Sequence, residues 1–176
     1  MGTWNSRGLR GSTLEEMINL TNEKYRSQGL ALIQKVPTPI TPIKMNEDHT
    51  QITLAYFEKK STIDYIGAVQ GIPVCFDAKE CNSDRFPLAN IHEHQMVFMR
   101  DMEKQDGVAF IIAWFTHVNE FYYIPYLKLV ELWNRGKSGG KKSFSRDELD
   151  RDYMIKVNGN NIHYLETVKR DLESRV

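Results

Sequence analysis

The order of apolar and polar residues predicts helices at both ends of the chain, with strands between them. Apolar side chains recur at helical spacing over 14–25, and Ser12 and Glu15 have the spacing of a capping box. We therefore expect a helix that begins near Ser12 and ends near Gly29. Similar patterns favour helices over 90–104, 127–133 and 161–175, with the helix over 127–133 stopping at Gly136.

The segments between these helices resemble strands. The longest apolar run, VAFIIAWF at 108–115, is typical of a central strand. A turn at 117–119 leads to another strand over 120–126, and shorter β-type segments lie at 30–36, 63–66, 72–79 and 153–157. Helices that flank such strands predict a single α/β domain over 1–176, with a mixed central β-sheet.

Two segments stand apart from this domain. Residues 1–11 contain three glycines, two arginines and no periodicity, which predicts a flexible basic arm. Residues 37–42, PTPITP, favour extended chain because proline fixes φ and lacks a backbone donor. Polar turn residues and the β-type run ITLAYF follow, so we interpret 43–57 as a hairpin that projects from the body.

The composition agrees with a globular protein. Of 176 residues, 41% are hydrophobic and 26% are charged. No run approaches the ~20 apolar residues of a membrane span, and the first residues lack the apolar core of a secretory signal. Two cysteines, Cys75 and Cys81, make a poor disulfide framework. We therefore expect a cytoplasmic protein without a membrane partner.

The distribution of charge is more informative than its sum. Lys and Arg number 23, as do Asp and Glu, so the net charge is zero. Arg7 and Arg10 nevertheless precede the first acid, and the segment 134–146 has five basic residues and no acid. This pattern favours local phosphate contacts, although two solvated loops would also produce it. The five residues are Arg135, Lys137, Lys141, Lys142 and Arg146.

Asp64, Asp77 and Lys79 form the candidate centre of chemistry. Twelve residues separate the two aspartates, enough for a turn and most of a returning strand, so we expect them on neighbouring strands. Side chains two apart share one face of a strand, which groups Asp77 with Lys79. Paired carboxylates suit Mg²⁺, and a nearby ammonium suits a phosphoryl transition state. A strand-end salt bridge is the structural alternative, and the spacing alone does not separate the two.

A zinc site is disfavoured, although His92, His94, Cys75 and Cys81 invite the comparison. His-x-His within a helix points its two rings to different faces, and paired Cys-x-x-Cys motifs are absent from the sequence. We expect the histidines to pack or to form hydrogen bonds near the site.

Longer motifs carry a resemblance to a known family. In order they are LEEMINLTNEKY at 14–25, KVPTPI at 35–40, AYFEKKSTIDY at 55–65, FDAKE at 76–80, FPLANIHEHQ at 86–95, QDG at 105–107 and KSFSRDEL at 142–149. With this combination the chain resembles the RecU-type Holliday-junction resolvases almost from end to end. The resemblance implies a restriction-endonuclease-like core of the PD-(D/E)xK nuclease fold, with 43–57 as a protruding stalk.

The resemblance also implies roles for individual residues. Lys79 would stabilise the transition state, and Asp64 and Asp77 would be catalytic. The family commonly has glutamate at the position of Asp77. The implied metal is Mg²⁺, for which Mn²⁺ could substitute, and the implied residues around it are Thr62, Asp64, Asp77 and Gln95.

The implied activity is that of a structure-selective endonuclease. It would resolve four-way DNA junctions by metal-dependent phosphodiester hydrolysis in recombination and repair, acting as a homodimer. Family members are also associated with modulating the strand-exchange recombinase, which makes that recombinase a candidate partner. The rival interpretation is a non-catalytic junction-binding or recombinase-regulating protein on the same fold, against which Asp64, Asp77 and Lys79 argue. A restriction-type duplex endonuclease is a further alternative, against which the stalk-like insertion counts.

Overall fold

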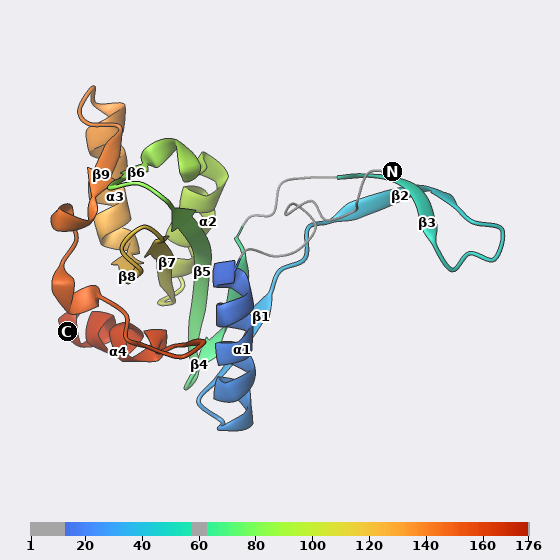
Figure 1. The fold of residues 1–176 in the computed structure, drawn as a ribbon, viewed down its shortest axis with the longest axis horizontal. Helices are drawn as coiled ribbons and strands as arrows, with labels where there is room; N and C mark the ends of the chain where they lie inside the picture. Colours follow the sequence, from blue (N-terminus) through green and yellow to red (C-terminus); the bar gives the residue numbers. More distant parts are fainter. Residues whose placement is uncertain (1–12, 58–62, 176) are drawn as a thin grey trace.

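A five-stranded mixed sheet forms the centre of the protein. The computed structural model describes residues 13–57 and 63–175, and Figure 1 shows their arrangement. The strand order is β1-β4-β5-β7-β8, in which β5 and β7 run parallel and the other neighbours antiparallel. The predicted central strand is confirmed as β7, which is paired on both sides. The strands are β1 (Ala31–Lys35), β4 (Tyr65–Val69), β5 (Ile72–Cys81), β7 (Val108–Phe115) and β8 (Glu120–Pro125).

Helices cover both faces of this sheet, so the predicted α/β architecture is confirmed. Met99 of α2 and Leu132 of α3 belong to one core layer, whereas Ile18 of α1 and Val168 of α4 belong to the other. Within 13–57 and 63–175, no helix is long and apolar enough to cross a membrane. The helices are α1 (Thr13–Ser27), α2 (Glu93–Glu103), α3 (Tyr126–Lys137) and α4 (Tyr164–Ser174).

The end of α3 differs from the prediction. The helix was expected to stop at Gly136, but it continues through that residue to Lys137. A Cβ atom at Gly136 would lie only 2.8 Å from Leu88 Cδ1. Gly136 is therefore a packing residue inside the helix, and the helix ends at the next glycine pair.

Short elements replace part of the structure expected near the C-terminus. A strand over 153–157 is wrong, because Tyr153 ends a 3₁₀ turn and only Val157 is in a strand. The last helix begins at Tyr164 and not at Asn161, because Asn161 pairs with Asn158 in a small hairpin. These elements are β6 (Arg85–Pro87), η1 (Leu88–Asn90), β9 (Ser143–Ser145), η2 (Arg146–Glu148), η3 (Arg151–Tyr153), β10 (Val157–Asn158) and β11 (Asn161–Ile162).

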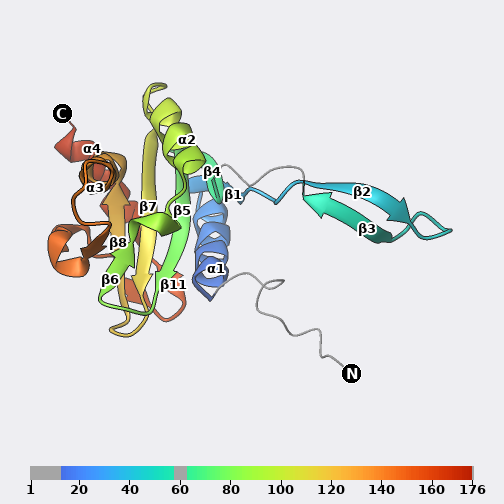
Figure 2. The same ribbon diagram turned by 90° about the horizontal axis from the view of Figure 1, so that it is seen from above.

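A separate hairpin projects from the body, as Figures 1 and 2 show. It consists of β2 (Ile40–Met45) and β3 (Ile52–Phe57), which pair only with each other among the described residues. Its turn is held by Asn46 Oδ1, which accepts the N–H groups of Thr50 at 2.8 Å and Gln51 at 3.1 Å. The predicted hairpin is present, and it begins three residues earlier than 43 because Ile40 already pairs with Phe57.

Candidate active site

Asp64 lies directly before β4, opposite Asp77, which is inside the neighbouring strand β5. The β4–β5 register pairs Tyr65 with Phe76, so one further step sets Asp64 opposite Asp77. Asp77 Oδ1 accepts the Asp64 N–H at 2.9 Å, and Asp64 Oδ2 accepts the Ala78 N–H at 3.0 Å. These reciprocal bonds prolong the ladder and hold the carboxylates together. The predicted placement on neighbouring strands is confirmed.

Asp77 is a buried acid with several donors around it. None of its side chain is exposed, and Lys79 Nζ lies 2.7 Å from its Oδ2. Gln95 Nε2 donates to the same oxygen. Burying an unpaired carboxylate is costly, and these donors, together with the Asp64 N–H, offset that cost. Lys79 is 19% exposed, so its ammonium lies between the buried acid and the solvent.

Gln95 reaches the carboxylates from the first turn of α2. Its Oε1 accepts the His92 N–H at 2.9 Å, which closes a capping box, while its Nε2 faces Asp77. A metal ion would be bound by the amide oxygen of Gln95, which here accepts the His92 N–H. The ligand role that the resemblance implies for Gln95 therefore stays a prediction. Periodicity does not single out Gln95, whereas the motif FPLANIHEHQ does.

Asp64, Asp77, Lys79 and Gln95 together form the active-site corner. The negative charge of its two carboxylates favours a cation. Burial, followed by the negative charge of Asp77, raises the pKa of Asp64 from 3.8 to about 6, while the Ala78 N–H and Lys79 act in the opposite direction. A divalent cation relieves such repulsion, and carboxylate and amide oxygens are ligands that suit Mg²⁺. The paired carboxylates therefore fit the implied metal, whereas Gln95 presents its Nε2 to them. The ligand set is sparse, because the part of the chain that the structure describes has no cluster of three or more His, Cys, Asp or Glu that could hold one. Thr62 lies outside the described residues.

Two further acids attach neighbouring elements to the site. Glu80 Oε1 accepts the Leu14 N–H at 2.9 Å, which fixes the start of α1 against β5. Glu15 pairs with Lys35 at 2.9 Å, and its charge also contributes to the raised pKa of Asp64. The expected capping partner of Glu15 lies outside the described residues. Sequence reasoning missed Glu80, whose signal is its place directly after Lys79, on the opposite face of the strand.

The histidines and cysteines near the site are arranged differently from the expectation. The rings of His92 and His94 stack, with centroids 5.4 Å apart and 14° between their planes. The prediction that they point to different faces is wrong, because His92 is the extended N-cap and not a helical residue. Cys75 and Cys81 are buried free thiols, and burial raises the pKa of Cys75 to about 12. This shift disfavours the thiolate that would bind zinc.

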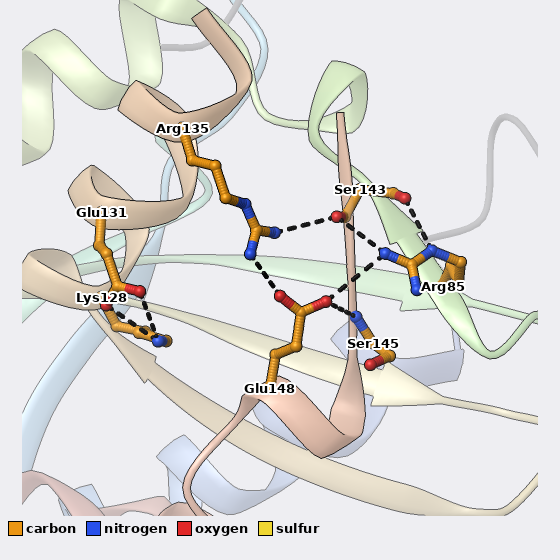
Figure 3. A network of polar contacts seen from close by, with 7 residues as sticks. All are labelled: Arg85, Lys128, Glu131, Arg135, Ser143, Ser145 and Glu148. Atoms are coloured by element: carbon orange, nitrogen blue, oxygen red, sulfur yellow. Dashed lines mark hydrogen bonds and ion pairs between the residues drawn. The ribbon is translucent and has the colours of Figure 1, made fainter. Parts of the chain in front are cut away.

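The basic segment 134–146 is structured by ion pairs. The alternative of a solvated loop is wrong for most of the segment, because α3 and β9 extend into it. Lys141 and Lys142 are exposed, and Figure 3 shows the network beside them. Arg7 and Arg10 lie outside the described residues. The ion pairs are Arg135–Glu148, Lys137–Glu93 at 2.9 Å and Arg146–Glu120 at 3.0 Å.

Comparison with known proteins agrees with the motifs. The family model described as RecU, Recombination protein U, matches residues 9–170. A Holliday junction resolvase RecU of Geobacillus sp. (strain WCH70) is 41% identical over 148 residues, covering 82% of this chain and 74% of the relative. Two proteins of the same name are 40% identical (Leuconostoc mesenteroides) and 39% identical (Pediococcus pentosaceus) over 173 residues. Each covers 95% of this chain, which spans 84% and 86% of their respective lengths.

Proposed function

The chain belongs to the RecU family, and we propose from this premise that it is an endonuclease that resolves four-way (Holliday) DNA junctions. One observation carries the enzymatic part of the proposal. Asp64, beside the start of β4, and Asp77, inside β5, are held together, with Lys79 and Gln95 directed at the buried carboxylate. A protein that only binds DNA has no need for paired acids beside phosphates, because they would repel the ligand.

We propose a restriction-endonuclease-like nuclease core that uses Mg²⁺, with Mn²⁺ as a substitute. Asp64 and Asp77 would hold the ion through carboxylate oxygens, and Thr62 and Gln95 would complete the protein ligands. When bound, such an ion polarises the scissile phosphate and lowers the pKa of an attacking water.

The residues of the chain prepare the site for this chemistry. The Asp77 carboxylate fixes the Lys79 ammonium at 2.7 Å, at the boundary between the buried acid and the solvent. A cation held in that place would offset the charge that develops on the phosphoryl oxygens. The capping box orients Gln95 from α2, so the α2 turn and the β4–β5 strands would move as one unit.

The hairpin supports a homodimer as the active form. Ile52, Leu54 and Tyr56 of β3 are apolar, and all three are exposed. Exposed apolar side chains on a projecting ribbon favour burial against a second copy. A two-fold dimer would present two sites to opposing strands of a junction, with the hairpins forming the stalk at its centre.

The remaining features fit a DNA enzyme of the cytoplasm. Exposed Lys141 and Lys142 would bind junction phosphates, and the strand-exchange recombinase stays a candidate partner. The free thiols of Cys75 and Cys81 would persist in a reducing compartment.

The proposal is tested with a synthetic four-way junction and a linear duplex of matched sequence. We expect Mg²⁺-dependent, paired nicks in the junction, little cutting of the duplex, and junction binding that persists in excess chelator. Wild-type protein that binds the junction but does not cut it with Mg²⁺ or Mn²⁺ would overturn the proposal in favour of the non-catalytic rival. Equal cutting of both substrates would favour a duplex endonuclease.

A further inference from the structure

The exposed lysines of the basic segment lie on a turn whose geometry is fixed. Gly139 follows the C-cap of α3 at φ +84°, and Gly140 donates its N–H to Arg135 O at 2.9 Å. This is the long-range bond of a Schellman motif, which ends a helix in one defined conformation. A Cβ atom at Gly140 would lie 2.8 Å from that carbonyl oxygen, so the close approach requires glycine. The sequence KSGGKK therefore forms a turn with one defined backbone conformation.

Glu148 holds the two sides of this turn together. Its Oε2 accepts Arg135 Nη1 from α3, and its Oε1 accepts the Ser145 N–H from β9 at 3.1 Å. Arg135 Nη2 in turn donates to Ser143 O at 3.1 Å, and Arg85 Nε donates to Ser143 Oγ at 2.9 Å. Figure 3 shows Glu148 between the two arginines. The hydrogen bond from Arg135 lowers the pKa of Glu148, so the acid stays ionised at neutral pH.

The same turn is connected to the active site. Leu88 donates its N–H to Lys142 O at 3.0 Å, directly after β6 has paired with β9. Five residues before Lys142, Lys137 of α3 meets the first turn of α2 through Glu93 at 2.9 Å. That turn contains Gln95, which donates to Asp77. A continuous set of contacts thus leads from Glu148 to the paired carboxylates.

We propose that Glu148 is a positioning residue, which holds the Lys141–Lys142 turn so that its two ammonium groups bind junction phosphates at a fixed offset from the Asp64–Asp77 site. The inference rests on the proposed function and deepens it. Glu148 itself touches neither DNA nor metal; it acts through Arg135 and the β6–β9 pair.

Charge alone makes the opposite prediction, which gives a sharp test. Glu148→Gln removes one negative charge beside a DNA-binding surface, so simple electrostatics predicts tighter binding. Positioning predicts weaker binding, because glutamine has one acceptor oxygen and cannot serve both Arg135 and the Ser145 N–H. Glu131→Gln is the matched control, because Glu131 also lies on α3 but forms a separate pair with Lys128 at 2.9 Å, as Figure 3 shows.

The experiment measures junction affinity in chelator against salt concentration for five proteins. They are wild type, Glu148→Gln, Lys141→Ala/Lys142→Ala, the triple variant and the control Glu131→Gln. We expect Glu148→Gln to raise Kd about three- to tenfold and to reduce the log–log salt slope by about one to two. The effect of Glu148→Gln should vanish when both lysines are absent, whereas Glu131→Gln should leave Kd equal or lower.

Cleavage kinetics separate positioning from loss of folding. At saturating junction, kcat of Glu148→Gln should stay within about threefold of wild type while KM rises with Kd. If Glu148→Gln does not fold, Arg135→Lys makes the same test, since it keeps the charge and loses the second donor to Ser143 O. Tighter binding, or an equal effect with and without the lysines, would overturn the inference. Because these binding measurements require no cleavage, their failure is distinct from failure of the proposed endonuclease activity.

Discussion

The active-site corner and the β2–β3 hairpin show opposite relations between polarity and burial. At the corner, Asp77 is charged and has no exposed surface. In the hairpin, Phe57 is apolar and 73% exposed. Each arrangement is unfavourable for an isolated side chain, and each is explained only by what surrounds it.

The two regions differ in where their partners come from. The partners of Asp77 belong to the same domain, namely the Asp64 N–H, Lys79 and Gln95, so the domain itself satisfies the buried carboxylate. The hairpin strands pair only with each other among the described residues, and their apolar side chains find no cover on the body. Contacts within the domain therefore account for the buried charge of Asp77, whereas the proposed dimer would account for the exposed apolar side chains of the hairpin.

The largest expected effect comes from breaking the corner at Asp77. Asp77→Asn removes the carboxylate that fixes Lys79 and would hold the metal, so we expect cleavage to fall by about 10³-fold. Junction binding should be unchanged or slightly tighter, because a negative charge near phosphates is lost. Cleavage rate, junction Kd and Tm are measured together.

The control for this variant is Asp77→Glu, which introduces the residue common in the family and should retain measurable cleavage. A well-folded Asp77→Asn protein that cuts at the normal rate would remove Asp77 from the site. A fall in cleavage that only follows a fall in Tm would reduce Asp77 to a structural role.

The proposed role of the hairpin in dimer formation is tested by replacing its exposed apolar side chains with charged ones. Ile52→Asp with Leu54→Asp should dissociate the proposed dimer at micromolar concentration, while the body keeps its fold because neither side chain contributes to the core. Sedimentation equilibrium reports the mass, and the ratio of paired to single nicks reports symmetric cutting. Thr53→Asp, which adds a charge at an exposed polar residue of the same strand, is the matched control and should remain dimeric. A double variant that stays dimeric would separate the hairpin from assembly.

The comparison also explains what the sequence could predict. The long apolar run at 108–115 and the alternation in FDAK fix β7, β5 and the shared face of Asp77 and Lys79, because such patterns follow directly from strand geometry. The placement of Gln95 was accessible only through the family motif, since its burial depends on how α2 packs. The ion pairs of the basic segment were not accessible, because Glu93, Glu120 and Glu148 come from separate elements.

A smaller expected effect is the change in the free energy of unfolding that the raised pKa of Asp64 causes. The pKa of Asp64 is about 6 in the folded protein against an ordinary 3.8, so between these values the folded state binds more protons than the unfolded state. Stability therefore falls as pH rises from about 4 to 6, and the deficit persists above 6. Asp64→Asn should remove it. Two pKa units correspond to about 2.7 kcal/mol, of which a weakened bond to Ala78 offsets part, so we expect a gain of about 1–2 kcal/mol.

This gain is measured by urea unfolding in chelator at about pH 7.5 and about pH 4. The difference between Asp64→Asn and wild type should be present at the higher pH and absent at the lower one. Adding Mg²⁺ should stabilise wild type more than the variant, since only wild type keeps both carboxylates for the ion. A variant that is less stable than wild type at both pH values would contradict the raised pKa of Asp64.

The smallest expected effect concerns the tip of the hairpin, and it tests whether the hairpin is ordered by its own turn or by a partner. Asn46 Oδ1 accepts two backbone N–H groups, from Thr50 and Gln51, at a place where the body offers no support. Asn46→Ala should cost about 1 kcal/mol of local stability, while the Tm of the body changes little, because the two regions share few contacts. Hydrogen exchange measures this directly: protection should fall in 46–51 and remain unchanged in β5 and β7.

The same measurement tests whether a partner orders the hairpin. Because a partner that buries the apolar side chains would hold the strands together from Ile52 onward, protection of β3 should survive the substitution in the dimer and fall in the Ile52→Asp/Leu54→Asp background. Equal loss of protection in both backgrounds would mean that the turn alone orders the hairpin, and that a second copy contributes nothing to it.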